Sequence, residues 1–454
     1  MTKVTLVYPF FEPRKDKSIF RFPPLGLGYV AAALKRHGVD VELVDCTFLT
    51  KQEALNRVKR SHPQIIGIYS MFSMNKTSIQ LAKLLRDSCD LLVAGGPLPT
   101  LDPTDFLEVF DVVAIGEGEE TIVELVNSYE QGLPISSVKG IAYKEEGVVV
   151  FSSPREFVKN LDAVAFPARE LFDNEKYKSY FFKRFGYTTT PLISSRGCPF
   201  SCDFCSRPVF GTSFRARSAS NIVKEVEAIA DLGYDRVWFA DDCFTLNKEH
   251  LLNVCDLLIS NHVGIEWECL SRVDTLDLNV ARRMKRAGCV RVFFGIESGN
   301  DEVLGLMNKQ ITTAQAHKAV YAAKEAGLQV GAFFIVGYPG ETDRTVLDTV
   351  RFASALPLDY LSFTLPYPIP GTALHERVKD NGGIIVDDWE EPKNWGLIRH
   401  KLLYGSSFSE TKLKFAIGKA QIQFRTRRLL GNGAYNVLGA PFERLTDATF
   451  KLMQ

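Results

Sequence analysis

The sequence predicts an α/β protein with an N-terminal doubly wound parallel sheet, a second strand–helix series, and a small, mainly helical C-terminal region. Short apolar runs alternate with helical stretches in two long series along the 454 residues, which is typical of parallel sheets covered by helices. Apolar residues make up 46% and charged residues 24% of the chain, which are ordinary values for a globular protein. A chain of this length is expected to form about two or three domains.

The first series is expected to form one domain over residues 1–135. Its predicted strands cover 4–8, 39–45, 65–69, 91–94 and 112–115, and its predicted helices cover 26–37, 52–61, 77–88 and 120–131. Ligands of such sheets bind beyond the carboxyl ends of the strands, where glycine lets a bulky ligand approach the backbone. Three of these ends carry glycines or small and polar residues: Tyr69, Ser70, Met71, Phe72 and Ser73; Gly95, Gly96 and Pro97; and Gly116, Glu117, Gly118 and Glu119.

Residues 136–187 are expected to form a connector. Two short apolar runs, 141–143 and 148–151, flank a Glu-Glu-Gly segment and predict a small hairpin. The prolines and charges of the remaining stretch predict an ordered crossover that runs over the surface.

The second series, over 188–372, contains six strand–helix units. Its predicted strands cover 192–195, 236–240, 265–270, 290–294, 330–336 and 360–365, and its helices cover 220–232, 248–261, 279–286, 313–326 and 344–355. Functional residues are again expected at the carboxyl ends of these strands. Arg215 and Arg217, after the first strand, are expected either to anchor the loop there or to be surface charges.

Three cysteines follow the first strand of this second series. Cys198, Cys202 and Cys205 are spaced C-x3-C-x2-C, with no fourth cysteine or histidine nearby. Three thiolates can bind three corners of a cubic iron–sulfur cluster and leave one iron open. A structural zinc site needs four ligands, and the next cysteine, Cys243, is far away in the sequence. Inert core thiols are the other alternative, but the proline, serine and aspartate between the cysteines predict a polar loop.

This spacing, with an aromatic residue directly before the last cysteine, resembles the signature of the radical S-adenosylmethionine (radical SAM) superfamily. The resemblance implies a partial (β/α)6 radical SAM barrel over 188–372, a [4Fe–4S] cluster on Cys198, Cys202 and Cys205, and S-adenosyl-L-methionine (SAM) on the open iron. A carboxylate suits the SAM amine and an arginine suits its carboxylate. The resemblance implies these SAM contacts: Phe204, Asp241, Asp242, Arg272, Glu297, Ser298 and Gly337.

The first domain resembles the Rossmann-like cobalamin-binding domain that precedes the barrel in one large class of radical SAM enzymes. The resemblance rests on the Pro-Pro-Leu-Gly-Leu segment at 23–27 and on the glycine-rich strand ends at 95–97 and 116–119. It implies that cobalamin binds the strand-end residues named above. The D-x-H-x-x-G motif, whose histidine ligates cobalt in other cobalamin proteins, is missing, and His37 and His62 are expected to be surface residues near helix ends.

Membership of this class would imply a reaction type. Family members pass a methyl group from SAM to cobalamin, and they use a second SAM to make a 5′-deoxyadenosyl radical that activates an unactivated sp3 carbon. That carbon then takes the methyl group from methylcobalamin. The resemblance therefore implies a radical SAM C-methyltransferase that needs an external ferredoxin- or flavodoxin-like electron donor.

Several alternatives stay open at this point. One is a cobalamin-dependent radical SAM cyclase or rearrangement enzyme, and another is a small-molecule C-methyltransferase of natural-product, lipid or tetrapyrrole biosynthesis. A third is an iron–sulfur and cobalamin protein of electron transfer or sensing. Methylthiolation by a related barrel would need further cluster cysteines, and the first domain has only Cys46 and Cys89.

Residues 373–454 are expected to be substrate-related and mainly helical. The stretch 411–430 interleaves lysines and arginines with apolar residues, which predicts an amphipathic helix packed on the barrel or a docking surface for an acidic partner. This basic helix favours a peptide or protein substrate over a small molecule. One family member methylates a glutamine of methyl-coenzyme M reductase, and the present chain is compatible with that example.

The composition argues against several other classes of protein. Lys plus Arg and Asp plus Glu both number 54, so the formal net charge of 0 does not indicate a nucleic-acid partner. No run of about 18 apolar residues predicts a membrane span, and the N-terminal segment does not resemble a secretory signal. Nine cysteines, an odd number, argue against a disulfide framework and suit a reducing cytoplasm. A monomer is expected.

Overall fold

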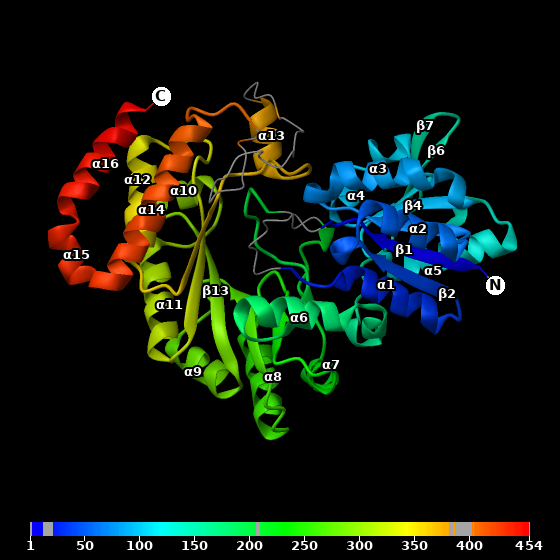
Figure 1. The fold of residues 1–454 in the computed structure, drawn as a ribbon, viewed down its shortest axis with the longest axis horizontal. Helices are drawn as coiled ribbons and strands as arrows, with labels where there is room; N and C mark the ends of the chain where they lie inside the picture. Colours follow the sequence, from blue (N-terminus) through cyan, green and yellow to red (C-terminus); the bar gives the residue numbers. More distant parts are fainter. Residues whose placement is uncertain are drawn as a thin grey trace. The chain divides into compact units, whose positions relative to one another are not determined.

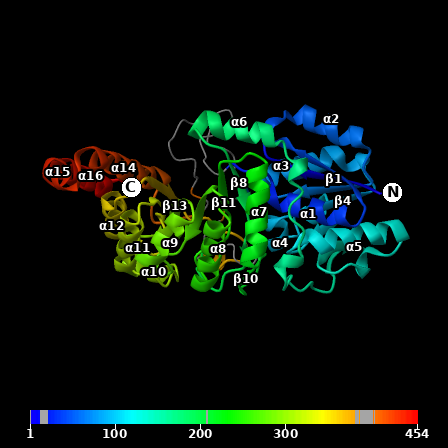
Figure 2. The same cartoon turned by 90° about the horizontal axis from the view of Figure 1, so that it is seen from below.

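The structure is a computed structural model, and it describes residues 2–11, 21–205, 209–380, 385, 402 and 404–453. The chain divides into two compact units, Met1–Cys198 with Arg207–Val237, and Pro199–Ser206 with Trp238–Gln454. Figures 1 and 2 show the elements of each unit in two views. Within the described residues, no helix combines the length and the hydropathy needed to cross a bilayer.

A seven-stranded sheet forms the centre of the first unit, in the order β2-β1-β3-β4-β5-β6-β7. The strands from β1 to β5 pair in parallel, and β6 and β7 add two antiparallel strands at one edge. The strands are β1 (Lys3–Tyr8), β2 (Asp40–Asp45), β3 (Ile65–Tyr69), β4 (Leu91–Gly95), β5 (Val112–Ala114), β6 (Ile141–Glu145) and β7 (Val148–Phe151). The helices are α1 (Leu25–Arg36), α2 (Lys51–Ser61), α3 (Asn75–Leu85), α4 (Pro97–Leu101) and α5 (Gly118–Gln131).

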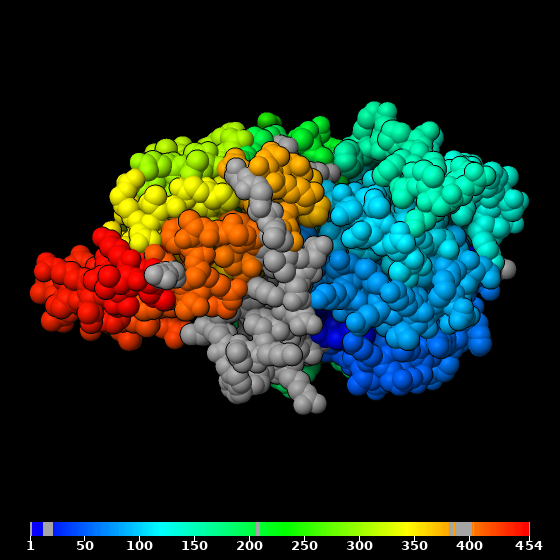
Figure 3. Space-filling view, turned by 90° about the horizontal axis from the view of Figure 1, so that it is seen from above, coloured from blue at the N-terminus to red at the C-terminus, as the bar shows by residue number. Residues whose placement is uncertain are grey.

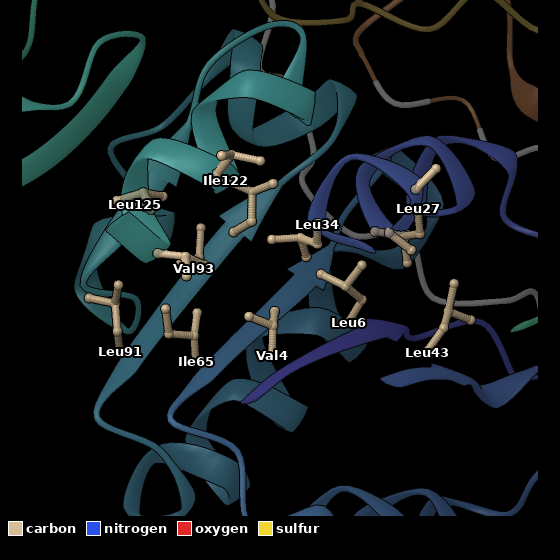
Figure 4. Close-up of a cluster of buried hydrophobic side chains, with 14 of the residues drawn as sticks. Val4, Leu6, Leu27, Leu34, Leu43, Ile65, Leu91, Val93, Ile122 and Leu125 are labelled. Atoms are coloured by element: carbon tan, nitrogen blue, oxygen red, sulfur yellow. The ribbon is translucent and has the colours of Figure 1, made fainter. Parts of the chain in front are cut away.

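Alternate residues of each strand face opposite sides of this sheet, as a period of two requires. Val4 and Leu6 of β1 pack with residues of α1 and α5, including Leu34 and Leu125, as Figure 4 shows. Val7 of β1 faces the other side, where residues of α2, α3 and α4 form a second core. The doubly wound sheet predicted from the sequence is therefore confirmed, with helices on both faces.

The segment after β7 differs from the crossover expected there. Residues Asn174–Phe185 form a helix, α6. Asp173 caps its N-terminus, because the Asp173 carboxylate accepts a hydrogen bond from the Lys176 amide. The predicted hairpin exists, but it extends the sheet because Val112 of β5 pairs with Tyr143 of β6. The unit continues with β8 (Thr189–Leu192), β9 (Ser195–Arg196), β10 (Arg215–Ala216) and α7 (Ala219–Asp231).

A six-stranded sheet has the order β15-β14-β13-β12-β11-β8, and β12 to β15 pair in parallel. Its further strands are β11 (Arg236–Phe239), β12 (Glu266–Ser271), β13 (Cys289–Glu297), β14 (Gln329–Ile335) and β15 (Tyr360–Thr364). The helices between them are α8 (Lys248–Ser260), α9 (Leu278–Arg286), α10 (Asp301–Leu306), α11 (Thr313–Glu325) and α12 (Asp343–Ala355). The six strand–helix units predicted for this part are thus present. The first strand begins three residues earlier than expected.

The C-terminal region is helical, as predicted. It contains α13 (Ala373–Asp380), α14 (Glu410–Leu430), α15 (Asn432–Leu438) and α16 (Ala440–Leu452). Helix α14 lies along α12, where the Ser354 hydroxyl donates to the Gln423 side-chain oxygen at 3.3 Å. Lys412 of α14 pairs with Asp343 at the start of α12, at 2.9 Å. Helices α14 to α16 lie side by side in both ribbon views (Figures 1 and 2).

Candidate functional site

A buried arginine stands at the carboxyl end of β12 in the second unit. The guanidinium of Arg272 makes two 2.9 Å hydrogen bonds to the Asp274 carboxylate, lies 3.5 Å from the Phe200 ring centroid and donates to the Lys309 carbonyl at 3.1 Å. Burial lowers the pKa of Arg272, but Asp274 and the nearby Cys202 thiol raise it, and the net shift is upward. The result is a fixed positive charge beside the loop that carries Cys198, Cys202 and Cys205, which we call the cysteine loop.

A second buried cation, Lys309, lies beside Glu297, the last residue of β13. Its ammonium group lies 3.0 Å from a Glu297 carboxylate oxygen and 5.7 Å from the centroid of the Phe204 ring. Burial lowers the pKa of Lys309, while the charge of Glu297 and the proximity of Cys202 raise it, and the net shift is upward. Lys309 is therefore positively charged at neutral pH.

The backbone around this ion pair adopts conformations that side chains rarely favour. Glu297, Asn308 and Gln310 have φ angles of 71°, 50° and 57°, in the left-handed region. At Gly295, a side chain would begin 2.5 Å from a Glu297 carboxylate oxygen, so only glycine leaves room for the pair. Such strain persists only where surrounding contacts enforce it, and it concentrates at functional sites.

The cysteine loop is held by its polar groups, through contacts within the second unit. The Asn308 side-chain amide donates to the carbonyl and hydroxyl oxygens of Ser201, at 2.8 and 3.0 Å. Asp203 forms an ion pair with Arg377, and its carbonyl accepts from the Leu374 amide at 2.9 Å. A surface hollow of about 600 Å³, lined partly by Asp203, Asn308 and Arg377, opens beside the loop.

The thiols of the motif differ from most other cysteines of the chain. Cys198, Cys202 and Cys205 are half-buried and in no disulfide, whereas five of the other six are buried. Three thiolates are the soft donor set that a [4Fe–4S] cluster takes, so the chemistry of these three residues fits such a cluster. Among the described residues, no three Cys, His, Asp or Glu side chains are grouped so that they could hold a metal ion.

The other SAM contacts predicted from the sequence also lie at or just after strand ends. Asp241 is buried after β11, and Asp242 beside it is exposed. The Ser298 hydroxyl pairs with the Thr349 hydroxyl at 2.9 Å. The Gly337 amide donates to the Glu341 carboxylate at 2.6 Å, and a side chain at Gly337, whose φ is +87°, would begin 2.4 Å from Leu413.

Sequence reasoning does not single out Lys309. It follows α10 in a polar Asn-Lys-Gln stretch that carries no motif. The paired left-handed residues on either side of Lys309 are visible only in the fold.

The cobalamin contacts predicted from the sequence form a compact group at the strand ends of the first unit. The Ser70 amide donates to the Gly95 carbonyl at 2.7 Å, and the Tyr69 and Tyr8 ring centroids lie 5.5 Å apart. A side chain at Gly96, whose φ is +111°, would begin 2.5 Å from the Ser70 carbonyl oxygen. The Gly116 amide donates a 3.1 Å hydrogen bond to the Thr100 hydroxyl, which links Gly116 to this group.

The remaining predicted residues of this group have different surroundings. Met71 and Phe72 are half-buried and Ser73 is exposed. Pro97 and Gly118 are the first residues of α4 and α5.

The two glutamates of the Gly-Glu-Gly-Glu segment are engaged by arginines of the same unit. Glu117 accepts from Arg196 and Arg215, both at 2.9 Å, and from the Val158 amide at 2.6 Å, while Glu119 accepts from Arg196. All four charged side chains are buried or nearly so. These carboxylates hold the strand that leads into the cysteine loop.

A second buried ion-pair group lies in the same unit. Glu225 of α7 pairs with both Arg169 and Arg217, and the Arg169 guanidinium also donates to the Pro191 carbonyl at 2.7 Å. The Glu225 side chain is only 1% exposed. Arg217 and Arg215 are therefore anchoring residues, one of the two roles expected from the sequence.

Two protein families match separate parts of this chain. Residues 16–126 match the B12 binding domain, and residues 192–353 match the Radical SAM superfamily.

Two curated proteins are similar over most of the chain. An uncharacterized methyltransferase of Pyrococcus horikoshii is 34% identical over 399 residues, which span 86% of this chain and 86% of that protein. An anaerobic magnesium-protoporphyrin IX monomethyl ester cyclase of Cereibacter sphaeroides is 25% identical over 394 residues, spanning 83% of this chain and 64% of that protein.

A solved structure has the same fold. It is the radical S-adenosylmethionine methyltransferase TsrM from Kitasatospora setae, with cobalamin and a [4Fe-4S] cluster bound. The likeness covers 85% of this chain and 76% of that chain, with a TM-score of 0.71 and 20% sequence identity.

Proposed function

Because this chain belongs to the cobalamin-dependent radical SAM enzymes, which use a [4Fe–4S] cluster, SAM and cobalamin, we propose that it methylates an unactivated sp3 carbon. The observation that carries the proposal is the presence of both cofactor-binding matches in a chain that is 34% identical to a methyltransferase along 86% of its length. An unactivated sp3 carbon offers no electron pair to attack SAM directly, so its methylation would draw on both cofactors. When bound, the cluster with SAM supplies hydrogen removal from carbon, and cobalamin supplies methyl-group transfer.

The residues around the cysteine loop support roles in holding SAM. Cys198, Cys202 and Cys205 would hold the cluster and leave one iron for the SAM amine and carboxylate. Glu297 has lone pairs beyond the one that Lys309 occupies, so it would accept from the ribose hydroxyls.

Some of the other predicted SAM contacts would touch SAM or the cluster directly, and others would act only through the backbone around SAM. Asp241 and Asp242 would receive the SAM amine, and Phe204 would pack beside the cluster. Arg272 would place a positive charge near the SAM carboxylate while Asp274 holds it in place. The Ser298 hydroxyl and the Gly337 amide have partners in the protein, so these residues would act by shaping the backbone around SAM.

The strand ends of the first unit would hold the corrin. Gly95 and Gly96 leave a backbone surface without side chains, and Tyr69 beside them is an aromatic wall. The loop from Tyr69 to Met74 would be the place for a group on the lower face of cobalt, and Pro97, Gly116 and Gly118 would border the ring. Glu117 and Glu119 would act indirectly, because arginines occupy their carboxylates.

A peptide or protein is the proposed substrate. Support comes from the exposed basic residues of α14, Arg425 and Arg428, which could attract an acidic chain. Lys412 and Lys419 do not contribute, because both are buried against acidic residues. A glutamine of methyl-coenzyme M reductase is one example of such a substrate.

Cyclisation or rearrangement is the second candidate function. The similarity to a magnesium-protoporphyrin IX monomethyl ester cyclase over 83% of the chain favours it. The same protein residues could hold SAM and cobalamin for either reaction. The products of turnover distinguish the two.

Methylation has a defined balance of products. For each R–H converted to R–CH3, one SAM would leave as S-adenosylhomocysteine. A second SAM would be cleaved to methionine and 5′-deoxyadenosine, which carries away the substrate hydrogen. Two electrons would come from an external one-electron donor of the ferredoxin or flavodoxin class.

The test uses the full chain, reconstituted without oxygen, and SAM labelled in its methyl group. The probe is an extract of the host cells, separated into a protein fraction and a small-molecule fraction. We expect carbon-bound label in the protein fraction, with S-adenosylhomocysteine and 5′-deoxyadenosine in about equal amounts. Label in the small-molecule fraction would refute the protein substrate but not C-methylation. Substrate-dependent 5′-deoxyadenosine without label or S-adenosylhomocysteine would refute methylation and favour cyclisation.

A further inference from the structure

Helix α16 packs against its own unit with its charged side. Glu443 pairs with Arg427 of α14 at 3.0 Å, and Asp447 pairs with Arg351 of α12 at 2.6 Å and with Lys419 of α14. Phe450 is the one residue of α16 that is buried. Both acidic residues of the helix therefore point into the protein.

The opposite side of α16 presents an apolar stripe to solvent. Pro441, Leu445, Ala448 and Leu452 recur at helical spacing and are all exposed, with Leu445 at 67% and Leu452 at 84%. A surface helix ordinarily places its apolar stripe against the core. In α16 the arrangement is reversed.

Neighbouring helices also expose apolar residues. Leu429 at the end of α14 is 84% exposed, and Val437 and Leu438 at the end of α15 are 75% and 68% exposed. Helices α14 to α16 form one end of their unit in Figure 2, and they lie at the surface in Figure 3. We call the residues Leu429, Val437, Leu438, Pro441, Leu445, Ala448 and Leu452 the outer stripe.

Basic residues accompany the outer stripe. Arg444 and Lys451 are exposed on α16, and Arg425 and Arg428 are exposed on α14. Over residues 410–452, lysines and arginines outnumber acidic residues by eight to three, although the whole chain has a net charge of 0. All three acidic residues there, Glu410, Glu443 and Asp447, already have basic partners. Exposed cations on α14 and α16 thus accompany the apolar outer stripe.

We propose that the outer stripe binds the surface of an anionic lipid membrane, with α16 lying in the interface. A helix with an apolar face flanked by lysine and arginine has this behaviour, and each cation adds attraction to anionic headgroups. A symmetric contact with a second copy would bring Arg444 and Lys451 toward their own equivalents. The charges therefore favour the membrane over self-association.

Vesicle sedimentation of the full chain tests this proposal. We expect binding to vesicles of phosphatidylglycerol and phosphatidylcholine, and at least about tenfold weaker binding to phosphatidylcholine alone. The double variant Leu445→Glu/Leu452→Glu should reduce partitioning at least about tenfold. Arg444→Gln/Lys451→Gln should weaken binding to the anionic vesicles roughly tenfold. The assay needs no cofactor, so its outcome is independent of the proposed reaction.

A matched control is available on the first unit. Val148 and Phe151 of β7 are also exposed apolar residues, at 65% and 62%, and Val148→Glu/Phe151→Glu should leave vesicle binding unchanged. Circular dichroism should show that every variant keeps its helical content. Absent binding by the wild type, or equal binding by the Leu445/Leu452 variant, would overturn the proposal. So would a dimer that this variant converts to monomer, or binding to soluble polyglutamate without binding to vesicles.

Discussion

The two units treat buried charge differently. In the first unit, Glu225 is shared by two arginines, and Glu117 accepts from two arginines and a backbone amide. In the second unit, Glu297 pairs with Lys309, and left-handed backbone lies at Glu297 and on both sides of Lys309. Saturated pairing holds a structure in place, whereas a carboxylate with spare lone pairs on strained backbone can bind a ligand. We call Glu117 and Glu225 with their arginine partners the bracing group, and Glu297 with Lys309 the candidate binding group.

The largest expected effect comes from the cysteines beside the binding group. Replacing Cys198, Cys202 and Cys205 with Ala should abolish the cluster and 5′-deoxyadenosine formation, because no thiolates remain to bind iron. The unfolding midpoint should stay near that of the cluster-free wild type, since the bracing group is intact. Iron content, 5′-deoxyadenosine and urea denaturation measure the three quantities. A variant that still makes 5′-deoxyadenosine would place the cluster elsewhere.

Removing the centre of the bracing group should cost mainly stability. In Glu225→Ala, Arg169 and Arg217 lose a carboxylate that is 1% exposed, so the free energy of unfolding should fall by about 3–5 kcal/mol. The surface pair of Arg282 with Glu325, more than half exposed on both sides, supplies the control. Glu325→Ala should cost less than about 1 kcal/mol. Equal losses in the two variants would contradict the comparison.

Removing the cation of the binding group should affect function more than cluster content. Lys309→Met leaves Glu297 without its 3.0 Å partner, and 5′-deoxyadenosine formation should fall roughly tenfold to a hundredfold, as for groups that support a metal site. Lys309→Arg keeps the charge and should retain most of the activity. Iron content should match the wild type in both variants. If Lys309→Met only lowered stability, Lys309 would belong with the bracing residues.

Glu341 should make the stability of the second unit depend on pH. Burial raises its pKa from 4.5 to about 7, although the Tyr338 and Gly337 amides oppose the shift. Between these values the folded state binds more protons, so stability should fall as pH rises through this window, by up to about 1.4 kcal/mol per pH unit. Urea midpoints from pH 5 to 8 would show this slope. It should disappear in Glu341→Gln, and an unchanged slope would exclude Glu341 as its source.

The smallest expected effect concerns the histidines of the first unit. His37 and His62 follow α1 and α2, are exposed and precede β2 and β3, so they lie at the edge of the sheet opposite the glycine-rich strand ends. His37→Ala and His62→Ala should leave cobalamin binding and the cobalt(II) electron paramagnetic resonance spectrum unchanged. Nitrogen splitting in the wild type that vanished in either variant would show that this histidine ligates cobalt.

Local patterns predict most of the fold. Both strand–helix series follow from apolar periodicity, because each strand buries alternate residues against helices. The strand β8 begins earlier than expected because Thr189 and Thr190 are buried although their side chains are polar. Helix α6 was missed because its Lys, Arg and Tyr residues resemble a surface connector.

Candidate sites were predictable where a motif carries the chemistry. The spacing of Cys198, Cys202 and Cys205 predicts a cluster-binding loop, whereas Lys309 becomes visible only when folding places it beside Glu297. The partners of Glu117 are also hidden in the sequence, since Arg196 lies 79 residues away. Pairing between charged residues that are distant in sequence depends on the tertiary structure, and the apolar periodicity of the sequence does not predict it.

The antiparallel pairing of β9 with β10 has a consequence for assembly. Arg196 and Arg215 are register partners, and both hold Glu117. The two ends of the segment that carries the cysteines are therefore fixed by the protein alone. Folding already brings the ends of this loop together, so most of the entropy cost of closing the loop is incurred before iron and sulfide bind. Cluster binding then costs less conformational entropy. We therefore expect the cluster to assemble on an already folded apoprotein.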